Sequence, residues 1–347
     1  MVNNKSLNLS TLFYQYPAEL VATEPKRPSR VMWVENGEPQ ELIFSDFLNQ
    51  FKSGDVLVLN DTQVLKRRVF SGDLEILFLN SDESQMEWEV LFPSKKLHLG
   101  SKINLPGEFT AELIKKGRPQ KIRTDRPLSE SYFLDFAELP LPPYIQKARV
   151  ERHNVSEDKS WYQTAWAEKP GSLAAPTASL HFSGQDLETL AERGVIIKKL
   201  TLHVGLGTFL PLTEEAILSK TLHKEVVQIP LATWDEIQKA RAQGRRIWAL
   251  GTTVTRSLES CARGMLPQVQ SGYLGETDLF IQPGDEYLCV DGLLTNFHQP
   301  ESSLLALVQA FSGAETTRMC YEWAINKRFR LFSYGDLSAW IKPLKPI

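Results

Sequence analysis

The chain has 347 residues, of which 42% are hydrophobic and 23% charged, and a formal net charge of −3. This length exceeds the size at which one hydrophobic core stops growing, so two domains are expected. Three scattered cysteines exclude a disulfide framework or zinc-type spacing, and neither a secretory profile nor a membrane-length apolar run is present, so we expect a cytoplasmic protein with no membrane partner.

Short strands dominate the first half of the chain. Residues 31–36 and 55–60 form apolar runs typical of strands. Further strands are predicted between residues 64 and 139, separated by Gly and Pro turn signals, in LEILFLN, WEVLFP, KINLP, FTAELIKKG and SYFLDF. This spacing is typical of a small antiparallel barrel or sandwich. The prolines of LPLPPYI, which follows, should interrupt both strand and helix.

Basic residues gather within this β region. Three acidic residues, Glu108, Glu112 and Asp125, oppose nine basic ones between residues 95 and 126, namely Lys95, Lys96, Lys102, Lys115, Lys116, Arg118, Lys121, Arg123 and Arg126. Such a patch attracts a polyanion such as RNA. A solvated face of a β domain is the alternative.

From Trp161 onward, strands alternate with helices. Ser183 should cap a helix over Asp186–Arg193, and a capping box at residues 233–236 should open another that ends at Gly244. Strands are expected at 196–204, 245–250, 279–281 and 287–294, and helices at 254–264, 302–311 and 317–327. This alternation predicts an α/β domain that also takes the strands at 31–36 and 55–60, with the β region as an insertion.

Small or polar loops follow the predicted strands of the α/β domain. GLGTF follows LTLHV, GTTVTR follows IWAL, and TNFH follows CVDGLL. Ligands of α/β folds bind where strands deliver their carboxyl ends, so these loops should surround a site. Neither GxGxxG nor GxxxxGK[ST] occurs, so dinucleotide and ATP-phosphate binding are not supported.

Histidines mark the edges of these loops. His181, His203 and His298 each follow apolar residues, so each is either a core histidine or an imidazole at the site. His223 and Glu225 should share one face of a strand, where the carboxylate could tune the imidazole. No metal-ligand spacing is present, so no metal site is expected.

Three polar clusters complete the candidate site. Thr252, Thr253 and Arg256 open a predicted helix, where backbone N–H groups and a guanidinium can hold a carboxylate. The other two clusters are residues 60–62 (NDT) and the C-terminal FRLFSYGD. Ordinary capping and turn formation remain the alternative for each.

In order along the chain, these segments resemble the S-adenosylmethionine:tRNA ribosyltransferase-isomerase family of queuosine biosynthesis. The resemblance is carried by SGDVLVLNDTQV, PLPPYI, YQTAWA, GSLAAPTASLHF, TLHVGLGTFLPL, ALGTTVTRSLES, TNFHQPESSLLALVQAF and FRLFSYGD. It implies a barrel-like α/β domain of residues 1–62 and 150–347, with an antiparallel β-barrel inserted at 63–149. It also implies transfer and isomerisation of the ribosyl unit of S-adenosylmethionine onto 7-aminomethyl-7-deazaguanine at the wobble position of tRNA, yielding epoxyqueuosine, adenine and methionine.

The resemblance implies no cofactor, because S-adenosylmethionine is consumed, and we expect a monomer. It assigns proton transfer to His181, His203, His223 and Glu225. Substrate binding is assigned to Arg30, Asp61, Thr62, Arg68, Tyr144, Tyr162, Gln163, Thr164, Ala175, Pro176, Thr177, Gly205, Gly207, Thr208, Thr252, Thr253, Arg256, Asn296, His298, Arg330, Ser333, Tyr334 and Asp336.

The chain departs from the family pattern at Arg27, Lys66, Arg67 and Lys220. No whole motif is lost, so we keep the predicted activity. The alternatives are a tRNA-binding scaffold that lost the chemistry and a Ser/His hydrolase. The hydrolase is disfavoured because no GxSxG turn occurs.

Overall fold

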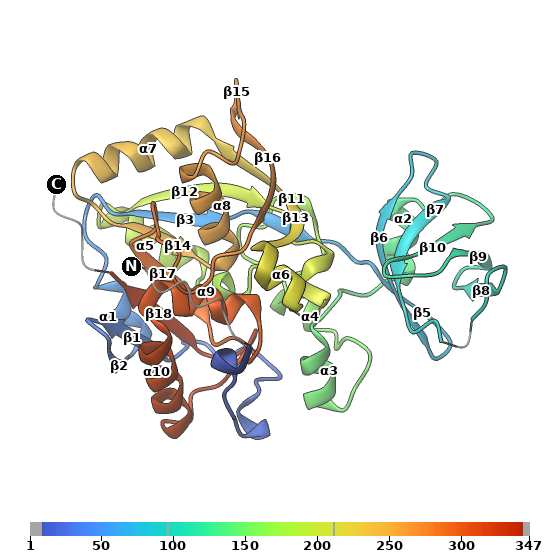
Figure 1. Cartoon of the computed structure of the whole chain (residues 1–347), viewed down its shortest axis with the longest axis horizontal. Helices are drawn as coiled ribbons and strands as arrows, with labels where there is room; N and C mark the ends of the chain where they lie inside the picture. The colour runs from blue at the N-terminus through green and yellow to red at the C-terminus, as the bar shows by residue number, and fades with distance from the viewer. Residues whose placement is uncertain (1–8, 96, 211, 343–347) are drawn as a thin grey trace.

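The computed structural model describes residues 9–95, 97–210 and 212–342 and has two bodies (Figure 1). The larger body holds a ten-stranded mixed sheet flanked by helices, and the smaller holds a six-stranded antiparallel sheet. The predicted α/β class with a small, barrel-like antiparallel insertion is therefore confirmed. None of the helices in these described ranges is both long and apolar enough to span a membrane.

The large sheet is parallel at its centre. Strands β12, β3, β14 and β17 are consecutive parallel neighbours. The full order is β15 (Gln268–Val269), β16 (Gly272–Leu279), β13 (Thr221–Pro230), β12 (Ile196–Leu202), β3 (Val56–Asn60), β14 (Ile247–Leu250), β17 (Gly292–Asn296), β18 (Leu337–Ile341), β1 (Val31–Glu35) and β2 (Glu38–Leu42).

This sheet is open, which corrects the barrel-like closure expected for the main domain. In the described ranges, β15 and β2 each pair with a single strand and form the two edges. The sequence of β2, EPQEL, explains its edge position, because charged side chains and a proline discourage further strand pairing.

Alternating side chains give the large sheet two buried faces. In β3, Val56 and Val58 belong to one hydrophobic cluster, whereas Leu57 and Leu59 belong to another. The same alternation separates Ala249 from its neighbours in β14. Both faces are covered by helices, and this is why the central strands read as continuous apolar runs.

The helices are distributed between these faces. On the Leu57 face lie α1 (Phe44–Leu48), η3 (Thr177–His181) and α5 (Gly184–Glu192). On the Val56 face lie η1 (Leu9–Leu12), η2 (Ala18–Leu20), α6 (Glu214–Ser219), α7 (Leu231–Ala242), α8 (Thr252–Ala262), α9 (Ser303–Ser312) and α10 (Ala314–Asn326). The turn η4 (Leu206–Phe209) follows β12.

The capping predictions had mixed outcomes. Ser183 caps α5 in a full capping box with Asp186, as predicted. The box predicted at residues 233–236 is wrong, because α7 begins at Leu231 after Pro230 and the Thr233 hydroxyl instead donates to the carbonyl of Lys199. Proline preorganises the start of a helix through its fixed φ.

The strand predicted at 287–294 begins only at Gly292. Residues 288–290 instead form a loop, with Cys289 and Val290 buried, whose backbone N–H groups donate to the fully buried carboxylate of Glu259. Because the Glu259 carboxylate accepts these hydrogen bonds in place of a neighbouring strand, the backbone of this apolar run is satisfied without strand pairing. The strand predicted at 279–281 is likewise wrong beyond Leu279, where β16 ends.

The insertion is built on its own core. Its strand order is β5 (Arg68–Ser71), β6 (Leu74–Ser81), β7 (Glu87–Leu91), β10 (Gln120–Thr124), β9 (Phe109–Lys115) and β8 (Lys102–Leu105). The strand predicted in SYFLDF is wrong: these residues lie in α2 (Glu130–Phe136), which buries Tyr132 and Phe133 against the core. Strands β5 and β10 were not predicted.

The connection between the bodies has its own small core. Strand β4 (Thr62–Val64) pairs with β11 (Lys169–Ser172), and α4 (Asp158–Trp161) lies nearby. Prolines do not prevent a helix here, since Pro143 is the first residue of α3 (Pro143–Arg149). Leu139, Leu141 and Ile145 pack with Tyr162 and Tyr334 of the main body. The domain boundaries at 62/63 and 149/150 stay predictions.

Candidate functional site

One pocket of about 970 Å³ lies where the central strands end. Residues at or just beyond the carboxyl ends of β12, β14 and β17 line it, including Val204, Gly251 and Asn296. Strand β18 runs antiparallel to β17, so its amino end brings Ser333 to the same place. The prediction that these distant loops converge is confirmed.

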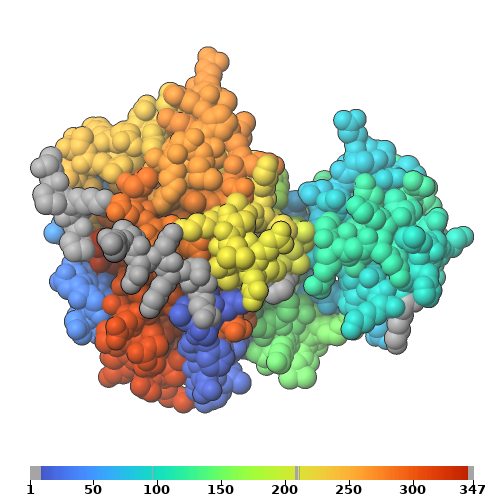
Figure 2. Space-filling model, in the orientation of Figure 1, coloured from blue at the N-terminus to red at the C-terminus, as the bar shows by residue number. Residues whose placement is uncertain are grey.

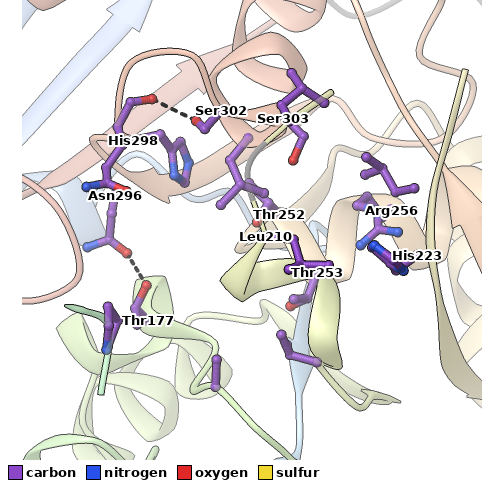
Figure 3. A pocket seen from close by; sticks show the side chains of 18 of the residues that line it. Thr177, Leu210, His223, Thr252, Thr253, Arg256, Asn296, His298, Ser302 and Ser303 are labelled. Atoms are coloured by element: carbon purple, nitrogen blue, oxygen red, sulfur yellow. Dashed lines mark hydrogen bonds between the residues drawn. The ribbon is translucent and has the colours of Figure 1, made fainter. Parts of the chain in front are cut away.

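More than half of the predicted site residues line this pocket. They are Tyr144, Tyr162, Ala175, Pro176, Thr177, Gly207, His223, Glu225, Thr252, Thr253, Arg256, Asn296, His298 and Ser333. The small residues of GSLAAPTAS form one wall, where Ala174, Ala175 and Ala178 leave space for a ligand. Figure 3 shows Thr177 and Asn296 on one side of the pocket, and Arg256 and His223 on another.

His181 lies behind this wall instead of in it. Its Nδ1 atom is 2.7 Å from Ser29 Oγ, and its Nε2 atom is 3.0 Å from Nδ2 of Asn296. Burial, reinforced by the charges of Arg27 and Arg330, lowers its pKa to about 3. The alternative of a core histidine with satisfied nitrogens therefore describes its position best.

His203 also lies outside the pocket lining. Its Nδ1 atom is 2.7 Å from Thr62 Oγ1, and burial lowers its pKa. A Cβ atom on Gly171 would lie 2.8 Å from the imidazole, so this glycine gives the ring its space. Asp61 is buried beside this pair and accepts a hydrogen bond from the Thr201 hydroxyl at 2.6 Å.

His298 lines the pocket from the loop after β17. Its Nε2 atom is 2.7 Å from the hydroxyl of Thr295, and burial lowers the pKa of the imidazole to about 3. The backbone is held on both sides, since the Tyr321 hydroxyl accepts from its N–H and the Tyr14 hydroxyl donates to its carbonyl. His298 is thus a neutral, fixed part of the wall.

Glu225 and Arg256 form a buried ion pair at another wall, where only 6% and 7% of their surfaces are exposed. Glu225 also accepts from the backbone N–H of Gly205 at 3.1 Å, and the Nε atom of Arg256 donates to the carbonyl of Leu279 at 3.0 Å. The Nη2 atom of Arg256 is buried without a hydrogen-bond partner among the described residues. Because the Glu225 carboxylate already has these partners, its main role is to hold the Arg256 guanidinium in place, and not, as predicted, to tune the imidazole of His223.

His223 lies on the same strand as Glu225, and both line the pocket, in agreement with the prediction that they share one face of a strand. Its side chain is exposed and has no hydrogen-bond partner within the described ranges. A Cβ atom on Gly207 would lie 3.1 Å from its Cβ, so the glycine-rich turn packs beside it. The side chain of Thr208, in the same turn, lies outside the described residues.

The remaining predicted residues lie outside the pocket lining. Arg68 is buried and paired with Glu138 at 2.8 Å, so it does not face the pocket. Arg30 pairs with Glu41 at 2.8 Å, and Gln163 bonds the backbone of Val64. Thr164 and Tyr334 are buried, while Asp336 accepts from the backbone of Arg30 and Arg330.

The four departures from the family pattern also find their places. Arg27 donates to the carbonyl of Leu180 beside His181, and Lys66 to the carbonyl of Leu134. Arg67 pairs with Glu130 and lies over Phe133. Lys220 pairs with Asp285 at 3.1 Å. All four therefore contribute contacts within the fold.

The pocket also includes residues that were not predicted to bind substrate. Ser302 and Ser303 line it at the start of α9, and the hydroxyl of Ser302 caps that helix. Arg118 lines it from the β9–β10 turn of the insertion, which meets the main body beside α6 (Figure 2). Arg118 belonged to the predicted basic patch, but no sequence signal could place this turn at the pocket.

The basic patch itself is less positive than its sequence suggests. Glu87, on the neighbouring strand β7, pairs with Arg123 at 2.7 Å and with Lys121 at 3.6 Å. Arg126 donates to two backbone carbonyls and lies over Phe109. Lys96 lies outside the described residues. Among the described residues of the patch, Arg118 is the cation that lines the pocket.

Comparisons with known proteins agree with this architecture. The profile of a family described as queuosine biosynthesis protein matches residues 9–339. The chain is 39% identical, over 95% of its length and 98% of theirs, to proteins of Staphylococcus aureus strains JH9 and Newman named S-adenosylmethionine:tRNA ribosyltransferase-isomerase.

A solved structure extends the likeness to the fold. The S-adenosylmethionine tRNA ribosyltransferase of Thermotoga maritima is 29% identical to the chain, with a TM-score of 0.55 over 95% of this chain and 100% of that one. Sequence and fold agree over nearly the whole length of both proteins. The chain therefore belongs to the S-adenosylmethionine:tRNA ribosyltransferase-isomerase family of queuosine biosynthesis, a family of transferases.

Proposed function

We propose that the chain transfers and isomerises the ribosyl unit of S-adenosylmethionine onto 7-aminomethyl-7-deazaguanine at the wobble position of tRNA. The products are epoxyqueuosine in tRNA, adenine and methionine. S-adenosylmethionine is a consumed co-substrate in this reaction, which takes place in the cytoplasm and requires no cofactor. The observation that carries the proposal is that motifs far apart in the chain line one and the same pocket.

Arg256 is the proposed ligand of the methionine carboxylate. Its Nη2 atom is buried, has no hydrogen-bond partner in the described ranges, and belongs to a residue that lines the pocket. Thr252 and Thr253 open α8 beside it, where the positive end of the helix dipole favours an anion. A carboxylate here would gain charge-assisted hydrogen bonds and would satisfy a buried donor.

The small-residue wall is proposed to hold the nucleoside. Ala174, Ala175 and Ala178 lack bulk, so the ribose and base can approach the backbone closely. The reaction needs a base for a proton beside the sulfonium and a donor for the departing adenine. His223 is the best placed imidazole, because it is exposed at the pocket and no hydrogen bond to another described residue occupies its nitrogens.

Arg118 is proposed to bind a phosphate of the tRNA next to the modified nucleotide. Its side chain is exposed, lines the pocket and has no ion-pair partner in the described part of the chain. An ammonium or guanidinium at the mouth of a pocket binds RNA through its phosphates without reading sequence. The insertion thereby gives the pocket a contact for the macromolecular substrate.

The test is adenine release. The protein is incubated with S-adenosylmethionine and tRNA carrying 7-aminomethyl-7-deazaguanine, and adenine is measured by chromatography. tRNA with unmodified guanine at the wobble position is the matched control and should release none. If the modified tRNA binds but yields no adenine, the chain is the tRNA-binding scaffold of the alternative interpretation.

A further inference from the structure

A buried chain of hydrogen bonds connects the wall of the pocket to the protein interior. The hydroxyl of Thr177 donates to Oδ1 of Asn296 at 2.8 Å, as the dashed line in Figure 3 shows. Nδ2 of Asn296 is 3.0 Å from Nε2 of His181, and Nδ1 of His181 is 2.7 Å from Oγ of Ser29. The hydroxyl of Ser29 lies 3.3 Å from the carbonyl of Lys26. Except for the carbonyl, these are side chains from three distant parts of the sequence.

The direction of every hydrogen bond in this chain follows from its two ends. The Asn296 amide group contacts the carbonyl of Ser333 at 3.4 Å, and a carbonyl can only accept. That contact orients Nδ2 toward His181, so Nε2 of the imidazole must accept. A neutral imidazole then carries its proton on Nδ1 and donates it to Ser29, whose own proton goes to Lys26.

We infer that His181 is a positioning residue that orients Asn296, and that the side chains of Asn296 and Thr177 offer only hydrogen-bond acceptors to the pocket. Both protons of the Asn296 amide are used inside the protein, and so is the hydroxyl proton of Thr177. The lone pairs that remain on Thr177 Oγ1 and Asn296 Oδ1 can only accept hydrogen bonds, so they favour a ligand group that donates a hydrogen bond. This identification rests on the proposed function, under which the donor is a ribose hydroxyl of S-adenosylmethionine.

The surroundings of His181 keep the imidazole neutral. The side chain is 5% exposed, and the charged groups that act on it are the guanidinium groups of Arg27 and Arg330. Both are positive and both oppose an imidazolium. Arg27 is held in place by two hydrogen bonds to the carbonyl of Leu180, the residue before His181. A neutral histidine with a fixed tautomer is a reliable acceptor and a poor proton shuttle.

The tautomer can be tested in the resting enzyme. Protein labelled with ¹⁵N-histidine is followed by two-dimensional NMR between pH 5.5 and 8, and the His181 signals are identified by their loss in His181→Gln. We expect a protonated Nδ1, an unprotonated Nε2 and no titration in this range. A His181 signal that titrates, or that has its proton on Nε2, would overturn the inference. This result does not depend on whether adenine is released.

Kinetics and binding provide the second test. We expect His181→Ala and Asn296→Ala each to weaken S-adenosylmethionine binding by about tenfold in calorimetry, the effect of one buried hydrogen bond. The double variant should be no weaker than Asn296→Ala, because both substitutions remove the same interaction. The pH profile of kcat/KM should keep its shape in His181→Ala.

Two results would contradict this role for His181. Losses that multiply in the double variant would mean that the two residues act independently. A missing limb in the pH profile of His181→Ala would make the imidazole an acid or base in the reaction. If His181→Ala fails to fold, His181→Gln keeps a side-chain acceptor and should recover part of the binding. Wild-type protein that binds S-adenosylmethionine but releases no adenine in the presence of tRNA carrying 7-aminomethyl-7-deazaguanine would refute the proposed function but not this assignment.

Discussion

The buried pair of Glu225 and Arg256 gives the sharpest quantitative prediction. In Glu225→Ala, Arg256 loses its ion-pair partner and the N–H of Gly205 loses its acceptor. The guanidinium stays buried and, among the described residues, keeps only its hydrogen bond to the carbonyl of Leu279. The substitution therefore leaves a charge inside the protein without compensation.

The expected loss of stability follows from the burial of this pair. Removing one partner of a buried ion pair costs about 3–5 kcal/mol. The lower end applies here, about 3 kcal/mol, because the pair borders the pocket and water can reach the exposed part of Arg256. The matched control is Glu322→Ala, whose partner Arg318 lies one helical turn away with 57% of each side chain exposed. An exposed pair of this kind contributes about 0.3–0.5 kcal/mol.

The free energy of unfolding of Glu225→Ala and Glu322→Ala is measured by urea unfolding, followed by tryptophan fluorescence. The double variant Glu225→Leu/Arg256→Met should recover part of the loss, because it leaves no unpaired charge behind. In calorimetry, Glu225→Ala should also weaken binding of S-adenosylmethionine, since Arg256 is no longer oriented. The reasoning is refuted if Glu225→Ala and Glu322→Ala lose equal stability, or if the double variant loses the sum of its single effects.

Other parts of the structure give three further predictions. Arg118→Gln should weaken tRNA binding and reduce the slope of log K against log salt by about 1. In the control Arg123→Gln, the slope should change less, because Arg123 already pairs with Glu87. Equal slopes for the wild type and Arg118→Gln would mean that Arg118 faces only solvent. Burial lowers the pKa of His298 to about 3, so as the pH is lowered the unfolded state binds a proton that the folded state does not. The free energy of unfolding should therefore decrease by about 2 kcal/mol from this residue when the pH is lowered from 7 to 5. In urea unfolding, the free energy of unfolding of His298→Gln should decrease by that much less over the same pH range. A pH dependence equal to that of the wild type would contradict a neutral buried imidazole. Gly171→Ala should destabilise the protein by about 1–3 kcal/mol, because its Cβ would lie 2.8 Å from the ring of His203, whereas Gly184→Ala, with open space around it, should be neutral; similar melting curves for the two variants would contradict this close contact.

Local signals in the sequence account for much of the fold. The apolar runs of β3, β14 and β17 are recognisable because both faces of a central parallel strand are buried. The capping box at Ser183 is also local, since its partners lie three residues apart. The loops after these strands were predicted to meet because parallel strands end at one edge. The prediction failed where a partner lay outside the local pattern, as with Glu259 and the loop at 288–290.

The roles of individual site residues depended on tertiary contacts. His181, His203, His223 and His298 have similar sequence contexts, but the structure buries His181 and His298 and exposes His223. Glu225 was predicted to tune His223, two residues away, but it pairs with Arg256, 31 residues away.

Sequence alone thus determined that the apolar runs of β1, β3, β12 and β14 are strands, which turns lack bulk and which family pattern they follow, because these properties are encoded over a few neighbouring residues. Only the tertiary structure decided which imidazoles are buried, which carboxylates already have partners and that Arg118 of the insertion reaches the pocket. Burial and pairing depend on groups that the chain brings together from distant positions, and their free energies exist only in the folded state.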